Sequence, residues 1–360
     1  MDSLENKFTL EFQKLWSNKL SDSINCLAVG KPFLEELSEE NDILIGTTAG
    51  RVLILNQTKP VEGLLETKGG SIQSILLHDL TGFGALDLAV GDCDGIVTLF
   101  SRQQILSKRD LGSAITDLSI HSDLAGGCEI IAGDINGVLT SFQQHDALWK
   151  INISEESAKL ATLGVRGRKS PSIRCTLSTV LKDRFGMNMA CLLVCDGWPL
   201  IHFIQSGERI QSIRSPSVIH SLCAGNFINS NELRRFVVNN HKKSSESYKL
   251  DFQQVLMAGK DGYVYIMIDF ELMEFGTRFF NGSGFRPSTL GEKETDMIIC
   301  TGHSNEVLIY QNGKQISRIR TSDWPHAVTL GDINADGQDE LVLGLLDQTI
   351  EVYEWKLHKN

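Results

Sequence analysis

Short runs of hydrophobic residues recur along the whole chain, each followed by a turn and then by a second run. The clearest copy has a hydrophobic run at residues 86–91, a turn at 92–95 and a second run at 96–100. Hydrophobic residues at consecutive positions predict that the first run is a strand buried on both faces. The second run alternates apolar and polar residues, so we expect a strand that lies further out and is half solvated.

Seven copies of this unit align on the residue that ends the buried run, which we call the anchor. Four of the six spacings between anchors are 42 to 45 residues, as in propeller blades, and the other two are 62 and 64. The even period and the absence of long helical periodicity predict an all-β fold, a seven-bladed β-propeller, and exclude an α-solenoid or a βαβ fold. Two stacked β-sandwiches are an alternative, but they would not require so even a period. The anchors are Gly46, Gly91, Gly133, Cys195, Gly259, Gly302 and Gly344.

The two ends of the chain are expected to meet in the last blade. Residues 7–12 alternate apolar and polar side chains and precede the first copy, so they are predicted to form the outer strand that closes the ring. We therefore treat residues 1–360 as one domain. The long spacings contain insertions at 143–188 and 227–252. Part of the first should supply inner strands of the fourth blade, and the second is expected to be a mobile polar loop.

Composition narrows the class of partner and the compartment. The chain has 34 Lys and Arg against 45 Asp and Glu, a net charge of −11, which argues against sequence-independent binding of nucleic acid. No apolar run approaches the roughly 18 residues of a membrane span, and the N-terminus shows no signal region, so we expect a cytoplasmic protein without direct membrane insertion. The eight cysteines include no Cys-x-x-Cys pair and are expected to be reduced core residues.

The sharpest local motif is found at residues 332–340. Oxygen-bearing side chains stand at its first, third and fifth positions, a glycine follows, and a carboxylate comes at the ninth. These are ligands that Ca²⁺ prefers in a short loop. The alternative is a turn whose side chains cap their own backbone, and we expect the loop to fold without metal. The candidate ligands are Asp332, Asn334, Asp336, the backbone carbonyl of Gln338, and Glu340.

This motif, followed by the strand that begins at Glu340, resembles the FG-GAP repeat of integrin-alpha-type propellers. Phe83 and Gly84 stand where such a repeat carries its Phe-Gly, although Phe83 replaces a metal ligand there. The whole chain resembles the intracellular members of this group. The resemblance implies protein partners in a cytosolic regulatory complex: either a KICSTOR-like role in nutrient signalling to the TOR kinase, with recruitment to the lysosomal surface, or a BBSome-like role in ciliary traffic.

Signals for an enzyme are weak. Residues 164–170 resemble a phosphate-binding loop only superficially, because Arg168 stands where glycine is required before Lys169. The chain lacks a Gly-x-Ser-x-Gly elbow and a His-Glu-x-x-His motif. We therefore favour a non-catalytic interaction scaffold. The rival classes are a calcium-dependent adhesion propeller and a propeller enzyme whose residues gather at the axis. Trp198 and Trp324, each followed by proline, are interpreted as packing between blades, with partner anchors as the alternative.

Overall fold

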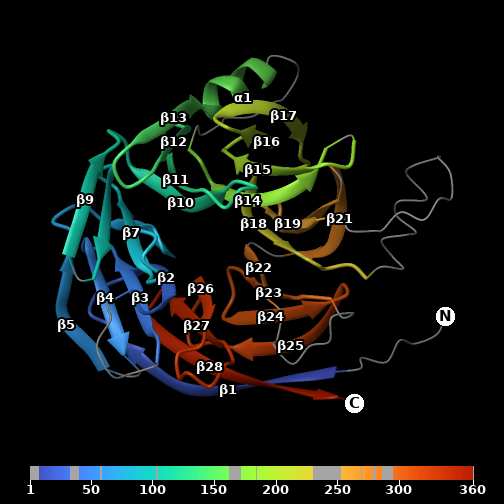
Figure 1. Cartoon of the computed structure of the whole chain (residues 1–360). Coiled ribbons are helices and arrows are strands. Elements are labelled where there is room, and N and C mark those ends of the chain that lie inside the picture. The colour runs from blue at the N-terminus through green and yellow to red at the C-terminus, as the bar shows by residue number, and fades with distance from the viewer. Residues whose placement is uncertain are drawn as a thin grey trace, which may run out of the picture.

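The computed structural model consists of seven four-stranded antiparallel sheets arranged as blades around a central axis (Figure 1). The predicted seven-bladed β-propeller is therefore confirmed. None of the described helices is long and apolar enough to cross a membrane. The structure describes residues 8–32, 40–56, 59–102, 104–161, 172–183, 185–229, 253–268, 270–278, 281–285 and 295–359.

The first strand of each blade lies nearest the axis; neighbouring first strands contact each other from blade one to blade six, and that of blade seven contacts that of blade one. The second strand is almost completely buried, as its consecutive hydrophobic residues predict, because a neighbouring blade covers each of its faces. The first strands are β2 (Ile24–Gly30), β6 (Ile72–His78), β10 (Ile115–Ser122), β14 (Cys175–Lys182), β18 (Ile219–Gly225), β22 (Asn281–Phe285) and β26 (Pro325–Gly331). The second strands are β3 (Asp42–Thr47), β7 (Asp87–Asp92), β11 (Cys128–Asp134), β15 (Asn188–Cys195), β19 (Gln254–Gly259), β23 (Met297–Thr301) and β27 (Glu340–Leu345).

The third strands are more buried than their alternating sequence predicted. In the strand Leu200–Gln205 only Gln205 is exposed, because a fourth strand covers its outer edge. The half-exposed pattern belongs to the fourth strands instead. The third strands are β4 (Arg51–Asn56), β8 (Ile96–Ser101), β12 (Val138–Phe142), β16 (Leu200–Gln205), β20 (Tyr263–Ile268), β24 (Glu306–Gln311) and β28 (Thr349–Lys359). The fourth strands are β5 (Lys59–Glu66), β9 (Gln104–Asp110), β13 (Ala147–Asn152), β17 (Glu208–Arg214), β21 (Glu271–Arg278), β25 (Lys314–Arg320) and β1 (Phe8–Lys19).

The anchor residue lies where two blades approach most closely. A Cβ atom on Gly91 would lie 2.6 Å from Cγ2 of Ile115 in the next blade, so the backbone there leaves no room for a side chain. The equivalent residues of the fifth and sixth blades, identified by their pairing with the third strand, are Ala258 and Thr301. The predicted anchors Gly259 and Gly302 are therefore one residue too late in those two blades.

The ring closes through the N-terminal strand, as predicted. β1 pairs antiparallel with β28 from Phe8 opposite Lys359 to Lys19 opposite Thr349, so it extends well beyond residue 12. Figure 1 shows the two strands side by side at the edge of the last blade. Leu10, which is only 3% exposed, joins a hydrophobic cluster that spans the sixth and seventh blades. Burial of this apolar side chain adds hydrophobic stabilisation to the closed ring.

The first predicted insertion is mostly regular structure. Within 143–188 the described residues form the outer strand β13, the helix α1 (Ile153–Ala161) and the innermost strand β14. The second insertion begins at Phe227, whose side chain is 1% exposed. Residues 162–171 and 230–252, which include most of the predicted mobile loop at 227–252, lie outside the described residues.

Candidate functional site

The loop between β26 and β27 contains the predicted calcium ligands, and its own backbone occupies them. Asp332 accepts the backbone N–H of Asp336 through Oδ1 at 3.1 Å and that of Gly337 through Oδ2 at 2.8 Å. Asp336 in turn accepts the N–H of Gln338 at 2.8 Å. Gly337 has a φ of 83°, a left-handed conformation that glycine adopts without strain. This arrangement is that of a turn capped by its own side chains.

Glu340 lies beneath this loop and is only 2% exposed. Its Oε2 accepts the backbone N–H of Ile333 at 2.9 Å, and its Oε1 accepts the side-chain N–H of Asn334 at 3.0 Å. Burial, with the nearby charges of Asp336 and Asp332, raises the pKa of Glu340 to about 7. A cation in the loop would attract these carboxylates and offset the repulsion among them, so the residue types suit Ca²⁺.

The side chains of this loop bond to its backbone and to one another. Asn334 turns its amide N–H toward Asp336 and Glu340, and its oxygen accepts a backbone N–H at 2.9 Å. Among the described residues, no group of three His, Cys, Asp or Glu side chains is placed to hold a metal ion. Calcium binding by Asp332, Asn334, Asp336, Gln338 and Glu340 therefore stays a prediction.

The position of Glu340 is polar and buried in other blades too, which gives it a structural role. At the start of the second strand of blade two, Asp87 accepts the Leu80 N–H at 2.9 Å. At the same position of blade five, Gln254 accepts the Phe227 N–H at 2.7 Å. A buried acceptor at this position fixes the preceding loop, with or without a carboxylate.

A buried cluster of Ser157, Asp196 and His202 tests the enzyme alternative, because these are the residue types of a catalytic triad. All three are 0% exposed. The Ser157 hydroxyl donates to Asp196 Oδ2 at 2.6 Å and lies 2.8 Å from His202 Nε2. A hydroxyl has one proton, so Nε2 must donate to Ser157. Burial lowers the pKa of His202 to about 4, and the neutral ring accepts the Ser212 hydroxyl at Nδ1, 2.8 Å away.

This order of contacts differs from that of a triad. A catalytic histidine lies between serine and aspartate and accepts the serine proton. Here Ser157 is the middle residue, and its hydroxyl proton is used in the hydrogen bond to Asp196. The cluster instead fastens α1, which carries Ser157, to the fourth blade. Sequence reasoning missed it because the residues are far apart in the chain and match no motif.

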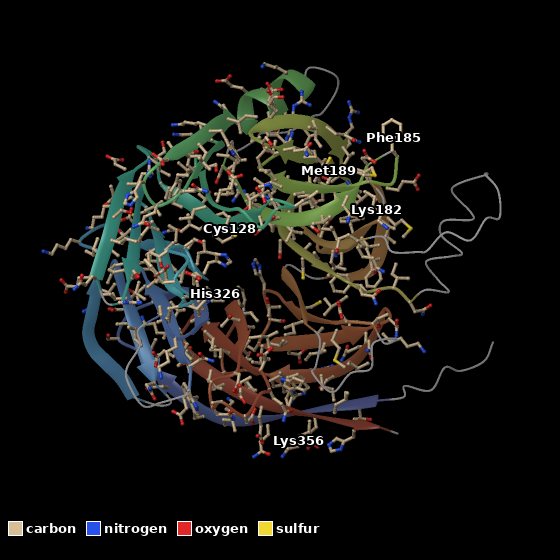
Figure 2. The ribbon with its side chains drawn as sticks, in the orientation of Figure 1. Cys128, Lys182, Phe185, Met189, His326 and Lys356 are labelled. Carbon is tan, nitrogen blue, oxygen red and sulfur yellow. The ribbon has the colours of Figure 1, made fainter. Side chains whose placement is uncertain are left out.

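One end of the propeller exposes large hydrophobic side chains on three adjacent blades. Among the described residues the most exposed are Phe83 at 76%, Phe185 at 75%, Met187 at 67% and Leu124 at 59%. They lie in the connections between the first and second strands of blades two, three and four, and such connections share one end of a propeller. Figure 2 shows Phe185 at the tip of the β14–β15 connection. We call these four residues the loop surface.

The backbone of each of these connections is fixed by an aspartate at its base. Asp79 accepts the Phe83 N–H at 3.1 Å, and Asp183 accepts the Phe185 N–H at 2.8 Å. Asp123 accepts backbone N–H groups two and four residues further on, at 2.8 and 2.7 Å. The side chains of the loop surface therefore stand on ordered loops, so binding a partner there needs little ordering of the backbone.

The two predicted tryptophans lie at the other end of the blades. Trp198 is half-buried, in agreement with a packing role, and its backbone N–H donates to Asp196 at 2.8 Å. Trp324 is 39% exposed and stacks on His303, with ring centroids 5.2 Å apart. The packing interpretation is therefore wrong in part for Trp324, because a sizeable part of its surface faces solvent.

Comparison with known proteins identifies the fold. The sequence matches no family model and no curated protein. The structure is similar to the crystal structure of BBS1N in complex with ARL6DN, soaked with mercury, with a TM-score of 0.65 and 11% identity over 96% of this chain and 97% of that one. It is also similar to the WD40 beta propeller domain of Doa1, with a TM-score of 0.60 and 10% identity over 96% and 97%. At such low identity these likenesses establish the propeller fold alone.

Proposed function

We propose that this chain is a non-catalytic interaction scaffold, a subunit of a protein complex that binds its partner through the loop surface. The observation that carries the proposal is the group of exposed apolar side chains Phe83, Leu124, Phe185 and Met187 at one end of three adjacent blades. Large apolar side chains that gather on one exposed end of a protein are typical of interaction sites, and aromatic side chains dominate the binding energy of interfaces. In the loop of blade seven, by contrast, the exposed residues at the same end, 334–339, are polar or small.

Two further observations support this role. One similar propeller, BBS1N, was crystallised with a protein partner, ARL6DN, which shows that this fold can present a surface to another protein. The triad-like cluster around Ser157 is buried and in the wrong order for catalysis, which supports a non-catalytic role. The net charge of −11 supports protein partners over nucleic acid.

The finer proposal rests on the resemblance to FG-GAP propellers. It assigns the chain to a cytosolic regulatory complex, KICSTOR-like and recruited to the lysosomal surface through its partners. The alternative is a BBSome-like trafficking subunit. The similarity to BBS1N supports the shared propeller fold and does not favour one of these two roles. The identity of the partners decides between the two.

A purification experiment with matched variants tests the scaffold role. The tagged full chain, the double variant Phe83→Ser/Phe185→Ser and the control Ile135→Ser/Leu346→Ser are purified from cells, and bound proteins are quantified by mass spectrometry. The control removes two exposed side chains, 49% and 53% exposed, at the opposite end of the propeller. We expect stoichiometric partners to be lost only from the loop-surface variant. Equal retention by all three chains would place the interface elsewhere, and the absence of any stoichiometric partner would contradict the scaffold role.

A further inference from the structure

The fourth blade contains two cysteines that face each other across neighbouring strands. Cys175 in β14 is paired directly with Cys195 in β15. Both carry free thiols, and they are 9% and 0% exposed. Both belong to the hydrophobic cluster between the fourth and fifth blades. The proximity of two thiols in one blade raises the question of whether they can form a disulfide.

The corresponding positions in other blades show how close these side chains come. Cys195 occupies the anchor position, and we call it and its first-strand partner the anchor pair. In blade seven the anchor pair is Ala327 and Gly344, and a Cβ on Gly344 would lie 3.2 Å from the Ala327 Cβ. A disulfide needs Cβ atoms about 3.5–4.5 Å apart. Side chains at this pair therefore point at each other at about disulfide spacing.

Blade four is the one blade with cysteine at both positions of the anchor pair. The facing Cys195 thiol and burial both raise the pKa of Cys175. Five of the other blades have glycine or alanine as the second member, and blade six has threonine. The anchor pairs are Cys26–Gly46, Ser74–Gly91, Asp117–Gly133, Cys175–Cys195, Ser221–Ala258, Asn281–Thr301 and Ala327–Gly344.

We propose that Cys175 and Cys195 are an oxidative modification site, which hydrogen peroxide converts into a cross-strand disulfide. Cys175, the more exposed thiol, reacts first: its thiolate attacks peroxide, the O–O bond breaks, and a sulfenic acid and water form. The Cys195 sulfur then attacks the sulfenic sulfur, and the S–O bond breaks with release of a second water. In sum, two thiols and one peroxide give one disulfide and two waters.

The environment of the pair determines the rate and the consequence of the reaction. A buried thiol is mostly protonated at neutral pH, so oxidation should be slow and should accelerate as pH rises. The new bond would close a loop of about 20 residues within one blade, which raises the melting temperature by constraining the unfolded chain, by about 5 °C. The new bond would form next to Asp196, which directly follows Cys195 and holds α1 through its hydrogen bond with Ser157.

Peptide mapping of the full chain tests the proposal. The native protein is treated with peroxide, quenched, alkylated in denaturant and digested. We expect a linked peptide joining Cys175 to Cys195 and a loss of two hydrogens in the intact mass. Cys191 is the matched control, because it lies in the same strand and is equally buried but faces Thr179. It should remain a thiol.

A variant then checks the order of the steps. In Cys195→Ala, Cys175 should stop at the sulfenic acid and be trapped by dimedone. The wild-type mapping decides the matter if this variant fails to fold. The proposal is overturned if both thiols survive prolonged peroxide treatment of the folded protein at raised pH, under which the exposed Cys93 is oxidised. It is overturned equally if Cys191 is linked as often as Cys195.

Discussion

Asp183 accepts the backbone N–H of Phe185 at 2.8 Å, and this bond holds the most prominent side chain of the fourth blade at the tip of its loop. The same oxygen also accepts the Met187 N–H, at 2.9 Å, and this second bond closes the loop. The two most exposed side chains of this blade are thus presented by a loop whose backbone groups are satisfied. Order in the free protein lowers the entropic cost of binding there.

Replacement of Asp183 separates the order of the loop from its apolar surface. Asp183→Ala removes both acceptor bonds while Phe185 and Met187 remain. We expect a loss of about 1 kcal/mol in the free energy of unfolding, measured with urea, and weaker partner binding. Asp183→Asn keeps an acceptor oxygen and should restore most of both quantities. If Asp183→Ala bound its partner as tightly as the parent, preorganisation of this loop would be irrelevant to binding.

The buried carboxyl of Glu340 should make stability depend on pH. Burial raises its pKa from 4.5 to about 7 in the folded chain. Because the folded state favours the protonated form, Glu340 contributes its full stabilisation of the folded chain below the unfolded pKa. This stabilisation is lost as pH rises through about 7. The free energy of unfolding of Glu340→Gln minus that of the parent, measured with urea, should therefore be larger at pH 8 than at pH 5. A parent-to-variant difference that is the same at both pH values would show that Glu340 does not titrate in this range.

The calcium hypothesis is tested by thermal melts in calcium and in chelator. A bound ion stabilises the native state by RT ln(1 + [L]/Kd), about 2.7 kcal/mol at a hundredfold excess over Kd. Because Asp332 and Asp336 already accept N–H bonds of the loop, we expect no shift in the parent. Asp336→Ala should be mildly destabilising in both buffers. A rise of several degrees in calcium that Asp336→Ala abolishes would establish a metal site.

Closure of the ring is tested by truncation. Deletion of residues 1–13 removes the pairing of β1 with residues 354–359 and the buried Leu10. Loss of that side chain and of the backbone bonds should lower the free energy of unfolding by about 3 kcal/mol, with a clear fall in the melting temperature. Scanning calorimetry provides the measurement. A truncated chain that melts like the parent would mean that the pairing contributes little to the fold.

The blade count was predictable because close approach between blades demands a small residue, and consecutive hydrophobic residues mark the strand that carries it. Sequence placed the anchors of blades five and six one residue late, because Ala258 and Thr301 fill the close-packed position and a glycine follows each of them. The burial of the third strands was underestimated, because their cover is a fourth strand that the repeat pattern did not include.

The site was harder to predict than the fold. Asp332 and Asp336 accept backbone N–H bonds as the turn interpretation expected, since that capping is local in sequence. The exposure of Phe185 was not predictable, because sequence alone does not distinguish a hydrophobic loop residue that packs against the core from one that faces solvent. The contact of Ser157 with Asp196 and His202 depends on how α1 folds against the fourth blade, which no periodicity encodes.

The most direct test of the central claim is the affinity of the purified full chain for its co-purified partner, measured by titration calorimetry. We expect Phe83→Ser/Phe185→Ser to weaken binding at least about tenfold, because exposed aromatic anchors carry most of the energy of an interface. We also expect that Ile135→Ser/Leu346→Ser binds like the parent, and that all three chains unfold at the same temperature. Unchanged affinity of the loop-surface variant, with the fold intact, would show that the loop surface does not bind the partner.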